Sequence, residues 1–157
     1  MRPLGHSKAA LKAAQEYITL RKEGQAVLMK ETAWKHNVPL REMKCAYRAI
    51  IKTENIFIPV RKHEVWINSF CDQLSLPEAV RNEATTICQL TSRATSGTSV
   101  SISAAAAIYI ACRKRDLPFY QRRLSETAGC SEVALRNRYR KMLQVAEQLR
   151  DQKEAAS

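Results

Sequence analysis

The chain repeats part of itself at a spacing of 92 residues, and this repeat limits the folds open to it more than any other feature. Residues 13–51 align without a gap to residues 105–143, and eight of the 39 aligned pairs are identical. The identical pairs are Ala13/Ala105, Ala14/Ala106, Tyr17/Tyr109, Ile18/Ile110, Arg21/Arg113, Lys22/Lys114, Tyr47/Tyr139 and Arg48/Arg140. A spacing this long excludes a solenoid of short repeats and indicates two domain-sized copies of one unit.

Both copies are predicted to be helical, so the expected fold class is all-α. Only four glycines and five prolines interrupt the 157 residues, and no segment shows the alternation of a strand. In the first copy, helices are predicted over 8–22, 29–35 and 41–52. Ser7 is the expected N-cap of the first helix, and Asn37 allows a left-handed turn before the third. We expect a partial unit over residues 1–52 and a linker over 53–62.

The second copy is predicted to be complete and to occupy residues 63–150. Trp66, Phe70 and Leu74 recur at helical spacing, and Pro77 opens a further amphipathic helix. The alanine-rich segment 102–112 is apolar on every side, so it is expected to be a central buried helix. Residues 151–157 are expected to form a flexible tail.

The formal net charge of +11 is concentrated on the two copies. Residues 1–62 hold 13 basic and 5 acidic residues, and residues 113–141 hold 9 and 3. Residues 63–112, in contrast, hold 2 basic and 4 acidic residues. Cations clustered in this way favour a polyanion as partner, because each neutralised phosphate releases condensed counterions.

Residues 121–143 have the order of a helix-turn-helix motif, with a short helix, a turn at Gly129 and a longer helix. The buried face of the longer helix is predicted to consist of Leu135, Tyr139, Met142 and Leu143. The opposite face is predicted to read bases through Val133, Arg136, Asn137 and Arg140. Arginine suits guanine, asparagine suits adenine, and valine can contact the methyl group of thymine. Phosphate contacts are expected from Arg122, Arg123 and Lys141.

The first copy repeats this layout with different residues. Its third helix is predicted to turn outward Arg41, Lys44, Cys45 and Arg48. Cys45 stands where the second copy has Asn137, and a thiol is a poor reader of bases. We therefore expect Arg41, Lys44 and Arg48 to contact mainly phosphates or protein.

Three segments of the second copy resemble the C-terminal cyclin-like repeat of the transcription factor IIB family, eukaryotic and archaeal. They are FCDQLSLPEAVRNEA, SISAAAAIYIACRK and ETAGCSEVALRNRYRKML, in this order and at the spacing of the family. The resemblance covers about residues 63–143 and is closer to the archaeal members. Residues 17–52 look, more weakly, like the closing helices of the family's first repeat.

The resemblance implies a cyclin-like fold whose repeats clamp the complex of TATA-binding protein and double-stranded promoter DNA. It also implies that the second helix-turn-helix reads an element upstream of the TATA box, at positions matching Val133 and Arg136. Ala134 departs from the usual threonine of the family, which leaves Ser131 to hold the start of the helix.

Two departures limit what the resemblance implies. The cysteine pairs of the family's zinc ribbon are missing, so recruitment of RNA polymerase is not carried over to this chain. The first repeat lacks room for its opening helices, and three helices are not expected to close the core of a five-helix repeat. The chain is then a fragment, a shortened relative whose first half leans on the second, or a helix-turn-helix fused to one repeat.

No catalytic residue, cofactor or metal site is predicted. His6, His36 and His63 lie in no recognisable nucleophile or metal arrangement, and the five cysteines form no Cys-x-x-Cys pair. Glu42, Glu126 and Glu132 lie among arginines and lysines and are expected to form ion pairs. Without an apolar run near 18 residues, no membrane association is expected. We expect an intracellular protein, in the nucleus if eukaryotic and in the cytoplasm with the nucleoid if archaeal.

Three functions fit these observations. The first is a IIB-type initiation factor that binds promoter DNA together with TATA-binding protein. The second is a stand-alone helix-turn-helix regulator, and the third is a cyclin-like module that binds a protein.

Overall fold

The computed structural model describes residues 5–58, 62–93, 95, 99–118 and 121–156, and every regular element in these ranges is an α-helix. The all-α fold class predicted from the sequence is therefore confirmed. The helices divide into two compact units, of which unit 1 ends at Arg61 and unit 2 begins at Lys62.

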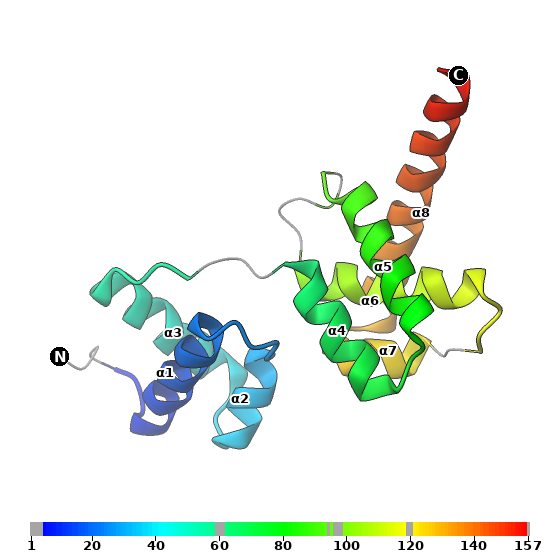
Figure 1. The fold of residues 1–157 in the computed structure, drawn as a ribbon. Helices are drawn as coiled ribbons and strands as arrows, with labels where there is room; N and C mark the ends of the chain where they lie inside the picture. The colour runs from blue at the N-terminus through cyan, green and yellow to red at the C-terminus, as the bar shows by residue number, and fades with distance from the viewer. Residues whose placement is uncertain (1–4, 59–61, 94, 96–98, 119–120, 157) are drawn as a thin grey trace. The chain divides into compact units, whose positions relative to one another are not determined.

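Unit 1 consists of α1 (Lys8–Lys22), α2 (Met29–Lys35) and α3 (Leu40–Glu54), and each of these helices contacts the other two (Figure 1). Ser7 caps α1 as predicted, since its Oγ accepts a hydrogen bond from the backbone N–H of Ala10 at 3.1 Å. The turn before α3 contains Asn37 in the left-handed region, with φ of 53°.

The three helices of unit 1 share a core of their own, contrary to the expectation that three helices are too few. The buried residues are Ala10, Ala13, Ala14, Tyr17, Ile18, Ala33, Val38, Met43, Ala46 and Ile50. Five of the ten are alanines, which let helices approach closely, so a small core fills with few side chains. The unit is short of helices but has a hydrophobic centre.

The segment predicted to be a linker, 53–62, belongs to unit 1 over its described part. Thr53 and Glu54 complete α3, and Asn55 ends the helix with φ of 49°. Ile56 and Ile58 then pack against the core of unit 1, so this part of the predicted linker is bound to unit 1. Residues 59–61 lie outside the described residues.

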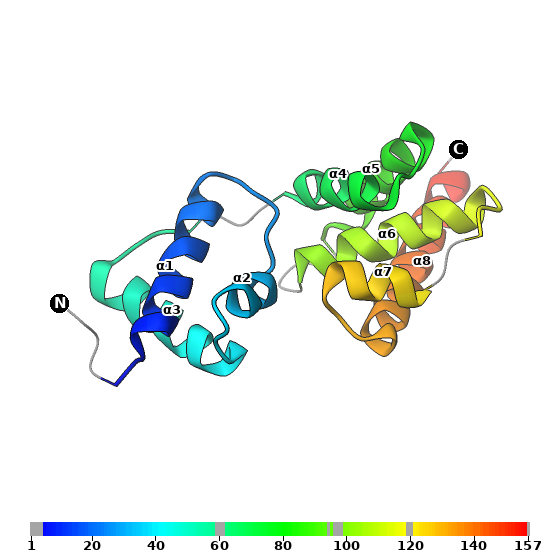
Figure 2. The ribbon, with the colours of Figure 1, turned by 90° about the horizontal axis from the view of Figure 1, so that it is seen from below.

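Unit 2 consists of α4 (His63–Leu74), α5 (Glu78–Thr91), α6 (Val100–Lys114), α7 (Gln121–Ala128) and α8 (Glu132–Ala155). Helix α6 lies between the α4–α5 pair and the α7–α8 pair and contacts all four (Figure 2). Its segment from Ala104 to Ile108 has no exposed surface. The predicted central buried helix is confirmed, and the arrangement is the cyclin-like all-α fold.

The C-terminal residues predicted to be a flexible tail instead continue α8 as far as Ala155. Residues 149–155 contain no glycine or proline and are rich in good helix formers. Arg150 and Glu154 form an ion pair at 3.4 Å with the i,i+4 spacing that supports a helix. Local propensity therefore extends the helix beyond the residues that pack against the bundle.

Most of the identities between the two copies lie where the central helix packs on the last helix. Tyr17 meets Tyr47 with ring centroids 5.4 Å apart in unit 1, and Tyr109 meets Tyr139 at 4.8 Å in unit 2. An arginine one turn later covers the first ring of each pair, with 5.7 Å and 5.9 Å to the centroid. The repeat therefore preserves one helix-helix interface with its cation–π contact.

Candidate nucleic-acid interface

The helix-turn-helix of unit 2 is formed by α7, the Gly129 turn and the first half of α8. Gly129 has φ of 67°, a left-handed conformation that favours glycine. Helix α8 then begins at the predicted cap, because the Ser131 Oγ accepts a hydrogen bond from the backbone N–H of Ala134 at 3.1 Å. Leu135, Tyr139 and Met142 are buried, so this side of α8 is fixed to the bundle.

The opposite side of α8 carries the four residues predicted to read bases, here called the reading face: Val133, Arg136, Asn137 and Arg140. Val133 is 56% exposed, so its methyl groups are available to a partner. Asn137 and Arg140 are exposed, and Arg136 is half-buried. No carboxylate of the described chain forms an ion pair with Arg136 or Arg140. The reading face thus offers cationic, amide and apolar groups to one partner.

The three cations predicted to contact phosphate beside the reading face are also exposed. Arg123 and Lys141 point to solvent. Arg122 pairs with Glu126 at 3.1 Å, as expected for that carboxylate, and both side chains are largely exposed. An exposed pair of this kind contributes little stability, so Arg122 can exchange it for a phosphate at small cost.

Helix α3 of unit 1 presents a second cationic surface, here called the basic face: Arg41, Lys44, Cys45 and Arg48. All four are exposed, and the described residues offer no acidic ion-pair partner to the three cations. The start of α3 differs from that of α8, because Pro39 stands at the N-cap and supplies no side-chain cap. The basic face therefore has the charge of the reading face without its amide.

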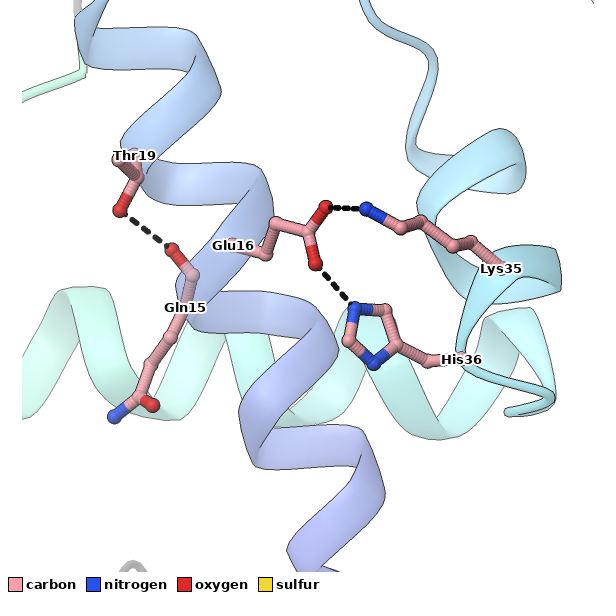
Figure 3. A network of polar contacts seen from close by, with 5 residues as sticks. All are labelled: Gln15, Glu16, Thr19, Lys35 and His36. Carbon is pink, nitrogen blue, oxygen red and sulfur yellow. Dashed lines mark hydrogen bonds and ion pairs between the residues drawn. The ribbon is translucent and has the colours of Figure 1, made fainter.

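In unit 1 an ion-pair network joins α1 to the end of α2 (Figure 3). The Glu16 Oε1 lies 2.6 Å from the Lys35 Nζ, and the Glu16 Oε2 lies 2.5 Å from the His36 Nε2. Hydrogen bonds from Lys35 and then from His36 hold the pKa of the Glu16 carboxyl below its ordinary value. These contacts hold α2 against α1 in unit 1. The sequence pattern did not predict them.

The cysteines fall into buried and accessible groups. Burial raises the pKa of the Cys71 and Cys112 thiols to about 11 and that of Cys88 to about 12. Cys45 is exposed and Cys130 is half-buried. Within the described residues, no group of three or more histidine, cysteine or acidic side chains could hold a metal ion. No described helix is both long and apolar enough to cross a membrane.

One residue at this site was missed by sequence reasoning. Arg138 lies on α8 between Asn137 and Tyr139, and its guanidinium turns inward to the start of α6 instead of outward. The repeat contains a sign of this contact. At the positions of Arg138 and its partner Ser103, the first copy has the apolar residues Ala46 and Leu11. A paired exchange of apolar for polar residues predicts a polar contact.

Comparison with known proteins agrees with this geometry. A family model described as the transcription factor TFIIB repeat matches residues 59–145. Transcription initiation factor IIB of Aeropyrum pernix is 35% identical over 106 residues, which are 66% of this chain and 33% of that protein. The protein of the same name from Saccharolobus shibatae is 30% identical over 142 residues, 89% of this chain and 46% of that protein. The protein of the same name from Methanococcus maripaludis is 31% identical over 140 residues, which are 88% of this chain and 41% of that protein.

The chain therefore spans between a third and a half of the length of these relatives. The family model covers more than half of the chain and includes the whole helix-turn-helix of unit 2. The relatives from Saccharolobus and Methanococcus match over a length that requires both units. The family match covers the helix-turn-helix that begins at Gln121, and the relatives match both helical units. The chain belongs to the transcription factor IIB family.

Proposed function

We propose that the chain acts in transcription initiation as a IIB-type core that binds promoter DNA beside the TATA box, together with TATA-binding protein. It does so by binding and geometry, without a chemical step. A factor of this kind works inside the cell, where its promoter DNA lies.

The observation that carries this proposal is the reading face at the start of α8. An α-helix fits the major groove of B-DNA, and the N-terminal residues of a recognition helix contact base edges. Val133 and Arg136 lie in the first two turns of α8 and turn away from the core. A reading face without a partner in its own unit is what such a contact requires.

The residues then divide into two roles. Base edges are contacted by the reading face, Val133, Arg136, Asn137 and Arg140. Phosphates are contacted by the remaining exposed cations of both units: Arg122, Arg123, Lys141, Arg41, Lys44 and Arg48. Phosphate contacts orient the protein on the duplex, and base contacts give its sequence preference.

A stand-alone helix-turn-helix regulator is the second candidate, and the core of unit 1 favours it. Three helices with their own buried centre form a complete small DNA-binding unit, which would need no TATA-binding protein. A cyclin-like module that binds another protein is the third candidate; the uncompensated charge of the reading face argues against it.

A gel shift on TATA-box DNA tests the proposal, with and without TATA-binding protein and at two salt concentrations. A supershift that needs the partner is the expected result. Sequence-dependent binding by the chain alone would support the stand-alone regulator, and no binding to DNA would leave the protein-binding module.

Two variants test the division of roles in the same assay. Arg136→Ala should lose about 1–3 kcal/mol of discrimination at the element upstream of the TATA box. Arg122→Ala should weaken binding to all sequences alike and reduce the salt slope by about 1. Equal losses on every sequence for both variants would contradict the proposed roles.

A further inference from the structure

Arg138 joins the recognition helix to the beginning of the central helix. Its Nη1 donates to the Ser103 Oγ at 2.6 Å and to the backbone oxygen of Ser99 at 3.1 Å. Ser99 is the N-cap residue of α6, and Ser103 lies in its first turn. The Ser99 hydroxyl also lies 3.0 Å from that of Ser101. The contact thus ties one point on α8 to a polar cluster at one end of α6.

Stability alone does not account for an arginine at this place. Desolvation by burial lowers the pKa of the Arg138 guanidinium, which means that the charged group loses hydration there. The same position in unit 1 is Ala46, fully buried, and the position of Ser103 is Leu11, packed against the core. An apolar pair therefore fills the equivalent interface, as burial of apolar surface generally can at lower desolvation cost.

What the arginine adds is direction. Apolar contacts are non-directional, so they hold two helices together without fixing their rotation or height closely. Two hydrogen bonds from one guanidinium to two points on α6 do fix them, since each weakens steeply when its geometry is lost. Recognition groups need to be held within about 0.5 Å and 10–20° of their working geometry. Unit 1, whose basic face lacks the amide, has no such contact at the equivalent residues.

We propose that Arg138 is a positioning residue that sets the rotation and height of α8 on α6 and thereby aims Val133 and Arg136 at base edges. The inference rests on the proposed function of the reading face and adds a residue that touches no DNA. It assigns Arg138 to sequence discrimination rather than to general affinity, which separates it from Arg122 and Arg123, the phosphate-contacting arginines of α7.

The test uses Arg138→Met, which keeps a long stem and removes every donor, and Ser103→Ala, which removes one acceptor. Arg150→Met is the matched control, because Arg150 is an exposed arginine farther along the same helix. Each variant is assayed with TATA-binding protein on promoter DNA with an intact or a substituted upstream element, at two salt concentrations.

Arg138→Met should lose discrimination by about 10-fold, the order of one base contact, and should keep the wild-type affinity for the substituted DNA and the wild-type salt slope. Ser103→Ala should lose part of the discrimination, and the double variant no more than Arg138→Met alone. Arg138→Lys should restore part of it through one donor, and Arg150→Met should change nothing. Amide exchange in the first turns of α8 should accelerate in Arg138→Met.

Two results would overturn the positioning role while leaving the proposed function intact. One is full discrimination by a folded Arg138→Met; the other is an equal loss on both DNAs with a smaller salt slope, which would make Arg138 a phosphate contact. If circular dichroism shows that Arg138→Met is unfolded, Ser103→Ala decides, and full discrimination by that variant rejects the role. A wild-type chain that does not discriminate between the two DNAs would reject both proposals.

Discussion

The central helices of the two units, α1 and α6, occupy equivalent places in the repeat but meet different surroundings. Helix α6 contacts four other helices of unit 2, whereas α1 contacts α2 and α3. The side of α1 that corresponds to buried residues of α6 carries polar groups at four positions. The pairs are Lys12 for Ala104, Gln15 for Ala107, Glu16 for Ile108 and Thr19 for Ala111.

The face of a helix that neighbouring helices cover can thus be inferred from the residue exchanges between the two copies of the repeat. The faces shared by α1 and α6 keep Ala13, Ala14, Tyr17 and Ile18, because both helices pack them against the last helix of their unit. The face that only α6 buries has become polar in α1. Glu16 has even gained a local role there, through its pairs with Lys35 and His36 (Figure 3).

The largest effect is expected when the two faces are exchanged at one position. Ile108→Glu should destabilise unit 2 by about 4 kcal/mol or more, because a carboxylate enters a site with no exposed surface. The mirror variant Glu16→Ile should change the stability of unit 1 by less than about 1 kcal/mol. Urea unfolding followed by circular dichroism measures both. Equal costs would mean that the polar face of α1 is packed as closely as the corresponding apolar face of α6.

The tyrosine pairs test whether the identities reflect packing. Tyr139→Ala should cost about 3 kcal/mol, since the ring is buried against Tyr109. Tyr47→Ala should cost about 2 kcal/mol, because Tyr47 is half-buried and loses less on truncation. Thermal unfolding gives the two values. A stable Tyr139→Ala variant with altered DNA binding would instead indicate that the two copies share this tyrosine for DNA binding.

The basic face and the reading face should respond differently to loss of charge. The double variant Lys44→Ala, Arg48→Ala should reduce the salt slope of DNA binding by about 2, close to 0.9 per phosphate contact. Its preference among promoter sequences should stay at the wild-type level. Titrations at several salt concentrations on matched DNAs measure both quantities, and a changed preference would give unit 1 a part in base reading.

The smallest effect is expected from Glu16→Gln, which should destabilise unit 1 by about 0.5–1 kcal/mol at neutral pH. The folded state lowers the pKa of Glu16, so its contribution is present above the ordinary carboxyl pKa and is lost as the pH falls through the lowered value. The difference between variant and wild type should therefore shrink as the pH falls through the lowered pKa, and disappear once the Glu16 carboxyl is protonated in the folded state. Amide exchange in α1 and α2 provides the measurement. A difference that persists in acid would exclude the ion pairs as its cause.

Much of the fold follows from the sequence because local signals and burial agree. Ser7 and Ser131 cap helices where the pattern predicted them, and the turns at Asn37 and Gly129 are left-handed. The first two helices have the predicted bounds. The extension of α8 past Arg150 was missed because residues 151–157 contain no large apolar side chain to pack against the bundle, although most of them favour a helix.

Other features depend on contacts between elements, which the pattern of one element does not contain. Trp34 is 85% exposed because Thr32 and Ala33 form the buried side of the short helix α2, and propensity alone would have buried the larger ring. The inward turn of Arg138 depends on Ser99 and Ser103, 39 and 35 residues away. The outward direction of the reading face was predictable, since helical periodicity fixes it once the buried face is known.

The distribution of thiols makes the protein easy to label without mutagenesis. A maleimide dye should attach first to Cys45 and more slowly to Cys130, whereas the three buried thiols stay protonated and unreactive near neutrality. One accessible thiol thus lies in each unit. Energy transfer between a donor dye and an acceptor dye on these two sites would report the distance between the units in solution. A dye on Cys45 of α3 would also change its signal when a partner binds the basic face.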